Sequence, residues 1–232
     1  MITAILFDLD DTLFDFHRGE AAALSETLRR LGVPVTDAIL ARYSEINREQ
    51  WELLERGLLT REQVLLRRYA LLFAETGIDR RPEDAQAQYE GLLSEQHMLI
   101  PGAEAVLDAL MPRYRLYAVS NGTASIQHRR LRDSGLEKFF SGIFISQEVG
   151  ADKPSSEFYD RCFASPELNG IRREDCIAVG DSLTSDILGA NNAGIRAVWF
   201  NPMRKPPTPG ITAERELYDL KALPAVLDEM QR

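Results

Sequence analysis

The sequence of 232 residues has few cysteines and no long apolar run. Cys162 and Cys176 are the only two, and each lies in an apolar pattern typical of a buried helix or strand, so we expect free buried thiols. The three histidines are scattered and lack the spacing of zinc ligands. No apolar run approaches the ~18 residues of a membrane span, and the N-terminus lacks the pattern of a secretory signal peptide. We therefore expect a cytoplasmic protein with no membrane partner.

Positive charge is also in short supply. Lys and Arg number 27 against 36 Asp and Glu, which gives a net charge of −9. Such a chain is a poor partner for a nucleic-acid polymer or an anionic membrane surface. It can still bind a small anionic metabolite if the site itself supplies cations. With 44% hydrophobic residues it can bury a core or two without disulfides. Monomer and homodimer are both open.

Three carboxylates follow the first predicted strand. Residues 3–7 form a short apolar run typical of a strand buried on both faces, and Asp8, Asp10 and Asp11 come directly after it. Two like charges about 4 Å apart repel by about 4 kcal/mol at an effective dielectric of about 20. Mg²⁺ would remove this cost, because it takes oxygen ligands from carboxylates and leaves room for a substrate phosphate. A solvated turn rich in aspartate is the simpler alternative.

The next stretch has the periodicity of helices and no convincing strand. Leu24, Leu28 and Leu31 lie on one helix face, and Thr60 with Gln63 predicts a capped helix start. We expect residues 15–98 to form four helices that together make up a cap domain. The core is then predicted to consist of residues 1–14 and 99–232.

From residue 101 onward, predicted strands and helices alternate. Strands are expected at 116–119, 143–145, 177–179 and 197–200, and helices at 103–110, 126–131, 158–163, about 184–192 and 220–230. Short links between them predict right-handed crossovers and an α/β fold with a parallel sheet. Residues 201–210 contain four prolines and are predicted to form a loop.

Polar side chains follow each of the first four predicted strands. These are Asp8 after the first strand, Ser120-Asn121-Gly122 after the second, Glu148 and Lys153-Pro154 after the third, and Asp181 and Asp186 after the fourth. In an open α/β sheet, ligands bind beyond the carboxyl ends of the strands. The sequence therefore predicts one site at this edge.

The residue types at this edge suit phosphoryl chemistry. Asp8 and Asp181 could share a metal ion, and Ser120 could donate to a phosphoryl oxygen. Lys153 offers a fixed positive charge that offsets the charge of a phosphoryl group. A carboxylate can attack phosphorus, and a second carboxyl can exchange a proton with the leaving oxygen and with water, which are the roles that Asp8 and Asp10 suit.

Four segments resemble, in order, the motifs of the haloacid dehalogenase (HAD) superfamily: residues 7–13, Ser120-Asn121-Gly122, Lys153-Pro154 and residues 180–186. The resemblance covers essentially the whole chain. It implies a Rossmann-like doubly wound parallel sheet core with an inserted α-helical cap domain. It also implies an Mg²⁺-dependent phosphatase that hydrolyses a small phosphomonoester through an aspartyl-phosphate intermediate.

The same resemblance implies a role for each motif residue. Asp8 would be the nucleophile and a metal ligand, and Asp10 the general acid/base and a ligand through its backbone carbonyl. Lys153 would hold the nucleophile and the phosphate. Asp181 would ligate the metal, and Asp186 would act as a ligand or orient the site. The implied phosphate-binding residues are Thr12, Ser120, Asn121, Gly122 and Lys153.

A finer resemblance concerns the cap. Asn47, Trp51 and Arg68, with Gly57 and Thr60 between them, are similar to the pattern of bacterial nucleotidases that act on pyrimidine nucleoside monophosphates. Residue Gln127 and residues 146–154 fit the same pattern. This implies a nucleoside 5'-monophosphate as substrate, contacted by Asn47, Trp51 and Arg68. Alternatively, Trp51 is part of the core, Gly57 and Thr60 form a turn and a helix cap, and Arg68 lies on a solvated face.

Several alternatives stay open. The substrate could be a phosphosugar, phosphoglycolate or acylneuraminate phosphate, and a phosphosugar mutase would share every core residue. A 2-haloacid dehalogenase needs neither a metal nor an acid at position 10, so Asp10 and Asp181 favour phosphate chemistry. A phospho-accepting receiver domain would need only about half this length and no cap. A catalytically inactive interaction protein would not need the intact acidic set.

Overall fold

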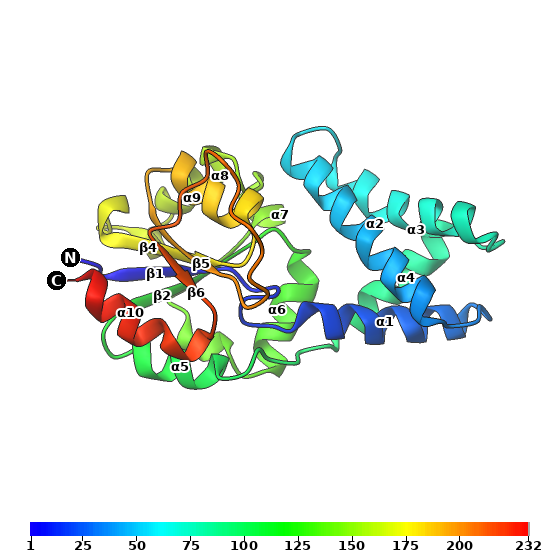
Figure 1. Ribbon diagram of the computed structural model, residues 1–232, viewed down its shortest axis with the longest axis horizontal. Coiled ribbons are helices and arrows are strands. Elements are labelled where there is room, and N and C mark those ends of the chain that lie inside the picture. The colour runs from blue at the N-terminus through cyan, green and yellow to red at the C-terminus, as the bar shows by residue number, and fades with distance from the viewer. Residues whose placement is uncertain (232) are drawn as a thin grey trace. The chain divides into compact units, whose positions relative to one another are not determined.

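The computed structural model describes residues 1–231 and divides the chain into two units (Figure 1). The core consists of Met1–Asp15 together with the chain from Leu99 onward, and the cap consists of Phe16–Met98. This division differs by the single residue Asp15 from the boundaries expected from the sequence. The cap is therefore an insertion directly after the acidic segment that follows the first strand.

The core contains one sheet of six strands in the order β3-β2-β1-β4-β5-β6, with every neighbouring pair parallel. The strands are β1 (Ala4–Phe7), β2 (Arg115–Ser120), β3 (Gly142–Ile145), β4 (Cys176–Gly180), β5 (Arg196–Phe200) and β6 (Arg215–Leu217). Because β1 is central, with β2 and β4 on its two sides, the strand order reverses there. Ligand sites are expected at such a switch point.

Helices cover both faces of the sheet (Figure 1). Successive side chains of a strand point to opposite faces, so Ile5 and Phe7 pack with one helical layer and Ala4 and Leu6 with the other. The first layer contains α5 (Ala103–Leu110), α6 (Ala124–Asp133) and α10 (Leu223–Met230), and the second contains α8 (Ser156–Phe163) and α9 (Leu188–Asn192). The predicted doubly wound α/β fold is confirmed.

Two elements differ from the sequence prediction. The helix expected at about 184–192 starts as a π-helical turn, η4 (Leu183–Ile187), before continuing as α9. A sixth strand, β6, was not predicted, because its sequence Arg-Glu-Leu has no apolar alternation to mark it. The remaining short elements are α7 (Ser146–Val149), η1 (Glu137–Phe139), η2 (Pro166–Leu168), η3 (Arg173–Asp175) and η5 (Leu220–Ala222).

The cap is built from the four predicted helices, α1 (Phe16–Arg30), α2 (Asp37–Glu55), α3 (Arg61–Thr76) and α4 (Pro82–Ser94). Thr60 and Gln63 form the predicted capping box at the start of α3. The cap interior is aromatic: the rings of Tyr43, Tyr69 and Tyr89 lie 5.2 to 6.0 Å apart between centroids. The cap therefore has a hydrophobic core of its own.

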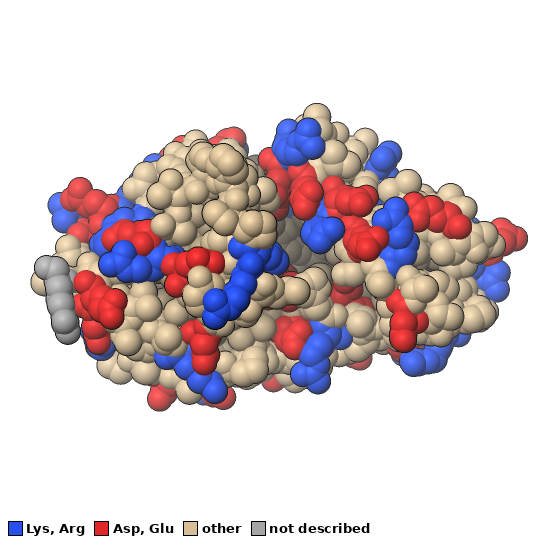
Figure 2. All heavy atoms as spheres, viewed as in Figure 1, with Lys and Arg blue, Asp and Glu red and all other residues tan. Residues whose placement is uncertain are grey.

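Both cysteines are free and buried, as predicted. None of the helices in residues 1–231 combines the length and apolarity needed to cross a membrane. On the face shown in Figure 2, acidic and basic side chains are interspersed rather than separated into one large basic patch.

Candidate active site

The chain turns sharply after β1. Asp8 is anchored by its backbone N–H, which donates to Val179 O at 2.9 Å, and Phe14 N–H donates back to Leu9 O at 2.8 Å. Asp11 N–H donates to Phe14 O at 2.8 Å, and Asp11 has a φ of +57°, a left-handed conformation that aspartate tolerates better than most residues. This turn fixes the acidic segment at the carboxyl end of β1.

The end of β4 supplies the other carboxylates. Asp181 follows the strand, and its carbonyl accepts a hydrogen bond from Trp199 Nε1 at 2.8 Å. Asp186 turns back from η4, and its Oδ2 accepts from Ser182 N–H at 3.0 Å. A Cβ at position 180 would overlap the Asp186 carboxylate, so Gly180 provides the space that this side chain occupies.

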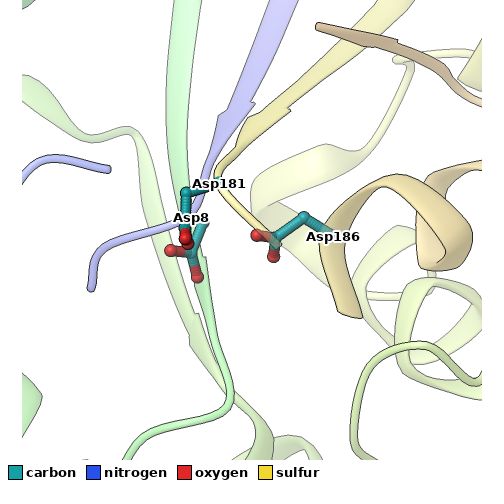
Figure 3. A group of neighbouring side chains, drawn as sticks. All are labelled: Asp8, Asp181 and Asp186. Carbon is teal, nitrogen blue, oxygen red and sulfur yellow. The ribbon is translucent and has the colours of Figure 1, made fainter. Parts of the chain in front are cut away.

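Asp8, Asp181 and Asp186 come together (Figure 3). Each offers one oxygen, and these oxygens all lie within 4.8 Å of one another. Asp8 and Asp181 directly follow the adjacent strands β1 and β4, and Asp186 lies in η4, 178 positions after Asp8. The proximity that a shared metal ion requires is therefore present.

Lys153 is the buried countercharge. Its Nζ donates to Asp8 Oδ1 at 2.8 Å, to Asp186 Oδ1 at 2.6 Å and to Val119 O at 3.0 Å, and its side chain is 1% exposed. All three ammonium protons thus have acceptors, which a buried charge requires. One ammonium still faces three carboxylates, so the cluster carries two excess negative charges when all are ionised.

The pKa values reflect this excess. Burial, with the neighbouring Asp186 carboxylate, raises the pKa of Asp8 well above its ordinary value, although Lys153 opposes the shift. Burial, with Asp186 and Asp11, raises the pKa of Asp181 to about 8. Burial opposes the charge of Lys153, but the Asp186 and Asp8 carboxylates outweigh it and raise the pKa of Lys153.

The donor set fits Mg²⁺. Its three carboxylates are hard oxygen ligands, and a divalent cation would neutralise the two excess charges left by Lys153. The only other ammonium paired with the cluster among the described residues is that of Lys205, whose Nζ lies 3.5 Å from Asp181 Oδ2 on a half-exposed side chain. Solvent screens this outer pair, so it offsets little of the buried charge.

Ser120 is the last residue of β2, and Asn121 follows it. Asn121 connects to the Lys153 segment: its Oδ1 accepts from Lys153 N–H and its Nδ2 donates to Lys153 O, both at 2.9 Å. Gly122 N–H donates to Ser120 Oγ at 3.0 Å. Thr12 Oγ1 is buried without a hydrogen-bond partner among the described residues. Phosphate binding by Thr12, Ser120, Asn121 and Gly122 stays a prediction.

Two residues of α6 contact Asp10. The nucleotidase resemblance included Gln127 without giving it a role, and nothing in the sequence analysis singled out Arg130. Arg130 NH1 donates to Asp10 Oδ1 at 2.5 Å, and Gln127 Nε2 donates to Asp10 Oδ2 at 2.7 Å. The two residues are three positions apart and so share one helix face. Their spacing after Ser120-Asn121-Gly122 is the only sequence signal that could have indicated this contact.

The cap residues expected to contact substrate lie in an internal polar cluster. Asn47 and Arg68 are buried, and Arg68 NH1 donates to Asn47 Oδ1 at 2.9 Å. Asn47 Nδ2 donates to Glu20 Oε1 at 2.7 Å. Trp51 is partly buried and donates through Nε1 to Asn47 Oδ1 at 3.1 Å. Substrate contact by these three residues stays a prediction, and Trp51 is the most accessible of them.

Comparison with known proteins identifies close relatives. The family model for haloacid dehalogenase-like hydrolases matches residues 2–194. YfnB of Bacillus subtilis (strain 168), named a HAD-hydrolase, is 37% identical over 224 residues, which cover 97% of this chain and 94% of YfnB. Pyrimidine 5'-nucleotidase PynA of Streptococcus pneumoniae (strain ATCC BAA-255 / R6) is 37% identical over 199 residues, covering 85% and 83%. Pyrimidine 5'-nucleotidase YjjG of Escherichia coli (strain K12) is 27% identical over 223 residues, covering 96% of each chain.

The structural comparison agrees. A crystal structure of YfnB bound to magnesium matches this chain with a TM-score of 0.93 at 36% identity, covering 98% of this chain and 99% of YfnB. The similarity thus extends over both the core and the inserted helices.

Proposed function

Because this chain belongs to the haloacid dehalogenase-like hydrolase family, we propose that it is an Mg²⁺-dependent phosphatase acting on a nucleoside 5'-monophosphate. The predicted family and the predicted class of enzyme are confirmed by the relatives. One observation carries the proposal of Mg²⁺-dependent phosphatase chemistry. Three carboxylates converge at the switch point of the sheet around a single buried lysine. Such a site suits a dianionic substrate together with a divalent cation.

The first half-reaction uses Asp8 as nucleophile. One carboxylate oxygen of Asp8 attacks phosphorus, and the bond between phosphorus and the ester oxygen breaks. The leaving oxygen keeps the electron pair of that bond and takes a proton from the Asp10 carboxyl group. The products are an aspartyl phosphate on Asp8 and a free alcohol. Lys153 holds Asp8 Oδ1 at 2.8 Å, which fixes the direction of the carboxylate.

The second half-reaction restores the enzyme. The Asp10 carboxylate takes a proton from a water molecule while the water oxygen attacks phosphorus. The bond between phosphorus and Asp8 breaks, Asp8 regains its carboxylate, and inorganic phosphate leaves. Asp10 ends protonated, as it began.

Asp8, Asp181 and Asp186 are the residues proposed to hold Mg²⁺, with the backbone carbonyl of Asp10 as a further ligand. When bound there, the ion supplies positive charge that offsets the carboxylates and the phosphoryl oxygens. Ser120 is proposed to donate to a phosphoryl oxygen, and Lys153 supplies the remaining fixed positive charge.

The nucleotide assignment is supported by two relatives named pyrimidine 5'-nucleotidases. A different small phosphomonoester, such as a phosphosugar, phosphoglycolate or acylneuraminate phosphate, is the alternative within the same chemistry. A haloacid dehalogenase reaction would leave both the acid at position 10 and the metal-binding carboxylate at position 181 without a role.

The test is a phosphate-release assay with and without Mg²⁺. Turnover of an aryl phosphate that needs Mg²⁺ and stops with a chelator is expected, together with no halide release from 2-chloropropionate. A panel of pyrimidine and purine nucleoside monophosphates and the alternative phosphoesters then identifies the substrate class. Metal-independent halide release, or a clear preference for a phosphosugar, would overturn the respective part of the proposal.

A further inference from the structure

A buried polar cluster of the core connects α6 with the proposed acid/base residue and the proposed phosphate ligand. Gln127 lies at its centre: its Nε2 donates to Asp10 Oδ2 at 2.7 Å and to Ser120 Oγ at 2.9 Å. Its Oε1 accepts from Arg130 NH1 at 2.9 Å, and the same NH1 donates to Asp10 Oδ1 at 2.5 Å. Both oxygens of Asp10 are therefore held from one side.

The exposure of these groups shows which side is left open. The side chain of Arg130 is 1% exposed, whereas that of Asp10 is 29% exposed. A carboxylate has about four lone-pair sites, two on each oxygen. The bonds to Gln127 and Arg130 use one site on each oxygen, on the buried side. The accessible edge of Asp10 keeps the sites that a leaving oxygen or a water molecule would meet.

The same cluster restricts the hydrogen bonding of the Ser120 hydroxyl. Its Oγ accepts from Gly122 N–H at 3.0 Å and from Gln127 Nε2 at 2.9 Å. A hydroxyl has two acceptor sites and one proton. Because both acceptor sites are in use, the orientation that remains for Ser120 is as a donor. A donor is what a phosphoryl oxygen needs, and Gln127 therefore sets the polarity of this hydroxyl.

The local fold provides for this arrangement. A Cβ at position 122 would lie 2.7 Å from Gln127 Cγ, so glycine at 122 makes room for the side chain of Gln127. The Arg130 guanidinium lies 4.3 Å from the ring centroid of Phe14, which supports its flat face. Burying a guanidinium is costly unless it is paired and hydrogen-bonded, and the acidic partner here is Asp10.

We propose that Gln127 and Arg130 are positioning residues of this enzyme: Arg130 fixes the Asp10 carboxyl group for proton transfer, and Gln127 also orients the Ser120 hydroxyl as a donor to phosphate. This proposal rests on the proposed phosphatase function. Neither residue needs to touch the substrate, because each acts through a group that does. The aim of the test is to separate this action from a structural role.

The leaving group makes that separation possible. Proton transfer to the leaving oxygen matters for an alkyl phosphate, whose alkoxide is a poor leaving group, and little for a p-nitrophenyl phosphate. kcat/KM reports the steps up to formation of the aspartyl phosphate. Arg130→Met is expected to lower kcat/KM for glycerol 2-phosphate by about 30-fold and for p-nitrophenyl phosphate by less than about 3-fold. Arg130→Lys should regain most of the lost activity on the alkyl ester.

Gln127→Leu tests the second part. It should show the same preference for the aryl ester and, in addition, weaken competitive inhibition by inorganic phosphate by about 10-fold, because Ser120 is no longer held as a donor. Arg130→Met should leave phosphate inhibition unchanged. Arg132→Met is the matched control, since Arg132 lies on the same helix with a largely exposed side chain and should behave as the wild type.

A double-mutant cycle that combines Asp10→Asn with Arg130→Met tests whether the two residues act in the same step. In the Asp10→Asn background, Arg130→Met should cost no further activity on the alkyl ester, because the two changes remove the same step. Equal losses on both esters, or additive losses with Asp10→Asn, would overturn the proposal. If Arg130→Met does not fold, the ester preference of Gln127→Leu decides. A wild-type protein that releases no phosphate from either ester with Mg²⁺ would instead remove the proposed function and this inference together.

Discussion

The core and the cap each contain a buried cluster of charged and polar side chains, and the two clusters differ in charge balance. In the core, Asp8, Asp181 and Asp186 outnumber Lys153. In the cap, the positive charge of Arg68 is matched by the negative charge of Glu20. Asn47 forms a hydrogen bond with each of these two residues. A cluster that is electrically balanced can be stable as it is, whereas one with excess negative charge favours the binding of a cation.

The hydrogen bonding reinforces this difference. Arg68 NH2 donates to Gln86 Oε1 at 2.7 Å, and its guanidinium lies 4.9 Å from the ring centroid of Tyr89. Its surroundings therefore satisfy it within the cap. The causes of the pKa shifts differ as well. Burial raises the pKa of Glu20, and Arg68 opposes that shift. Asp181 has neighbouring carboxylates that add to the effect of burial and raise its pKa to about 8, as is typical of functional sites.

The largest expected effect is on catalysis in the core. Asp8→Asn removes the proposed nucleophile and should lower kcat by about 10⁴-fold or more, without loss of folded structure by circular dichroism. Asp108→Asn, an exposed change on α5, is the control and should keep the wild-type rate. An Asp8→Asn enzyme that turns over at the wild-type rate would show that the core cluster is not the reacting site.

Replacing the positively charged side chain of each cluster should give two variants whose stabilities respond differently to Mg²⁺. Lys153→Met leaves buried carboxylates without their hydrogen-bond donor, and Arg68→Met leaves buried amide oxygens without theirs. In the presence of a chelator, each change should lower the free energy of unfolding by about 3 kcal/mol. Mg²⁺ at about 100 times the wild-type Kd should add about 2.7 kcal/mol to the wild type and to Arg68→Met, whose carboxylate site is intact. It should add more than this to Lys153→Met, because the three carboxylates there have lost their buried countercharge. Urea titrations with and without Mg²⁺ measure both, and an equal response of the two variants would contradict the comparison.

The core cluster should also respond to pH. The pKa of Asp181 is about 8 in the folded protein against an ordinary value of 3.8, and the pKa of Asp8 is raised as well. The folded state therefore binds more protons than the unfolded state, so the stability of the metal-free protein should be lost as pH rises from about 4 through about 8. Because Mg²⁺ must displace these protons, its stabilising effect should grow from pH 6 to pH 8. Melting temperatures measured in chelator and in Mg²⁺ test this.

Asp181→Asn is the matched variant for that measurement. It removes a titrating group and should flatten the pH dependence of the metal-free melting temperature. A shift on adding Mg²⁺ that is the same at every pH would count against the charge excess.

The smallest expected effect is on substrate selection by the cap. Trp51→Leu should raise KM for a nucleoside monophosphate by about 10-fold, or about 1.4 kcal/mol, and leave KM for an aryl phosphate unchanged. Leu66→Ala, an exposed position on α3, serves as the control. Unchanged nucleotide kinetics in Trp51→Leu would restrict the cap polar cluster to a structural role.

Local sequence signals predicted much of this molecule. The strand preceding Asp8 and the one preceding Asp181 are short apolar runs, and the rule that parallel strands present their carboxyl ends at one edge brought these two residues to one site. The helices of the cap were equally visible from their period and from the Thr60 capping box. The edge strand β6 and the π-helical start of η4 were not visible, because neither has a periodic apolar pattern of its own.

What the amino-acid sequence determined by itself was the order of the elements, the separate helical insertion and the set of carboxylates at the strand ends, because those depend on short-range patterns and on one topological rule. Tertiary structure alone decided that Gln127 and Arg130 hold Asp10, and that Asn47 and Arg68 lie inside the cap. Such contacts join residues that are distant in sequence or buried by packing. No local pattern encodes which face of a helix will meet a given carboxylate, because the packing of the whole unit fixes that face.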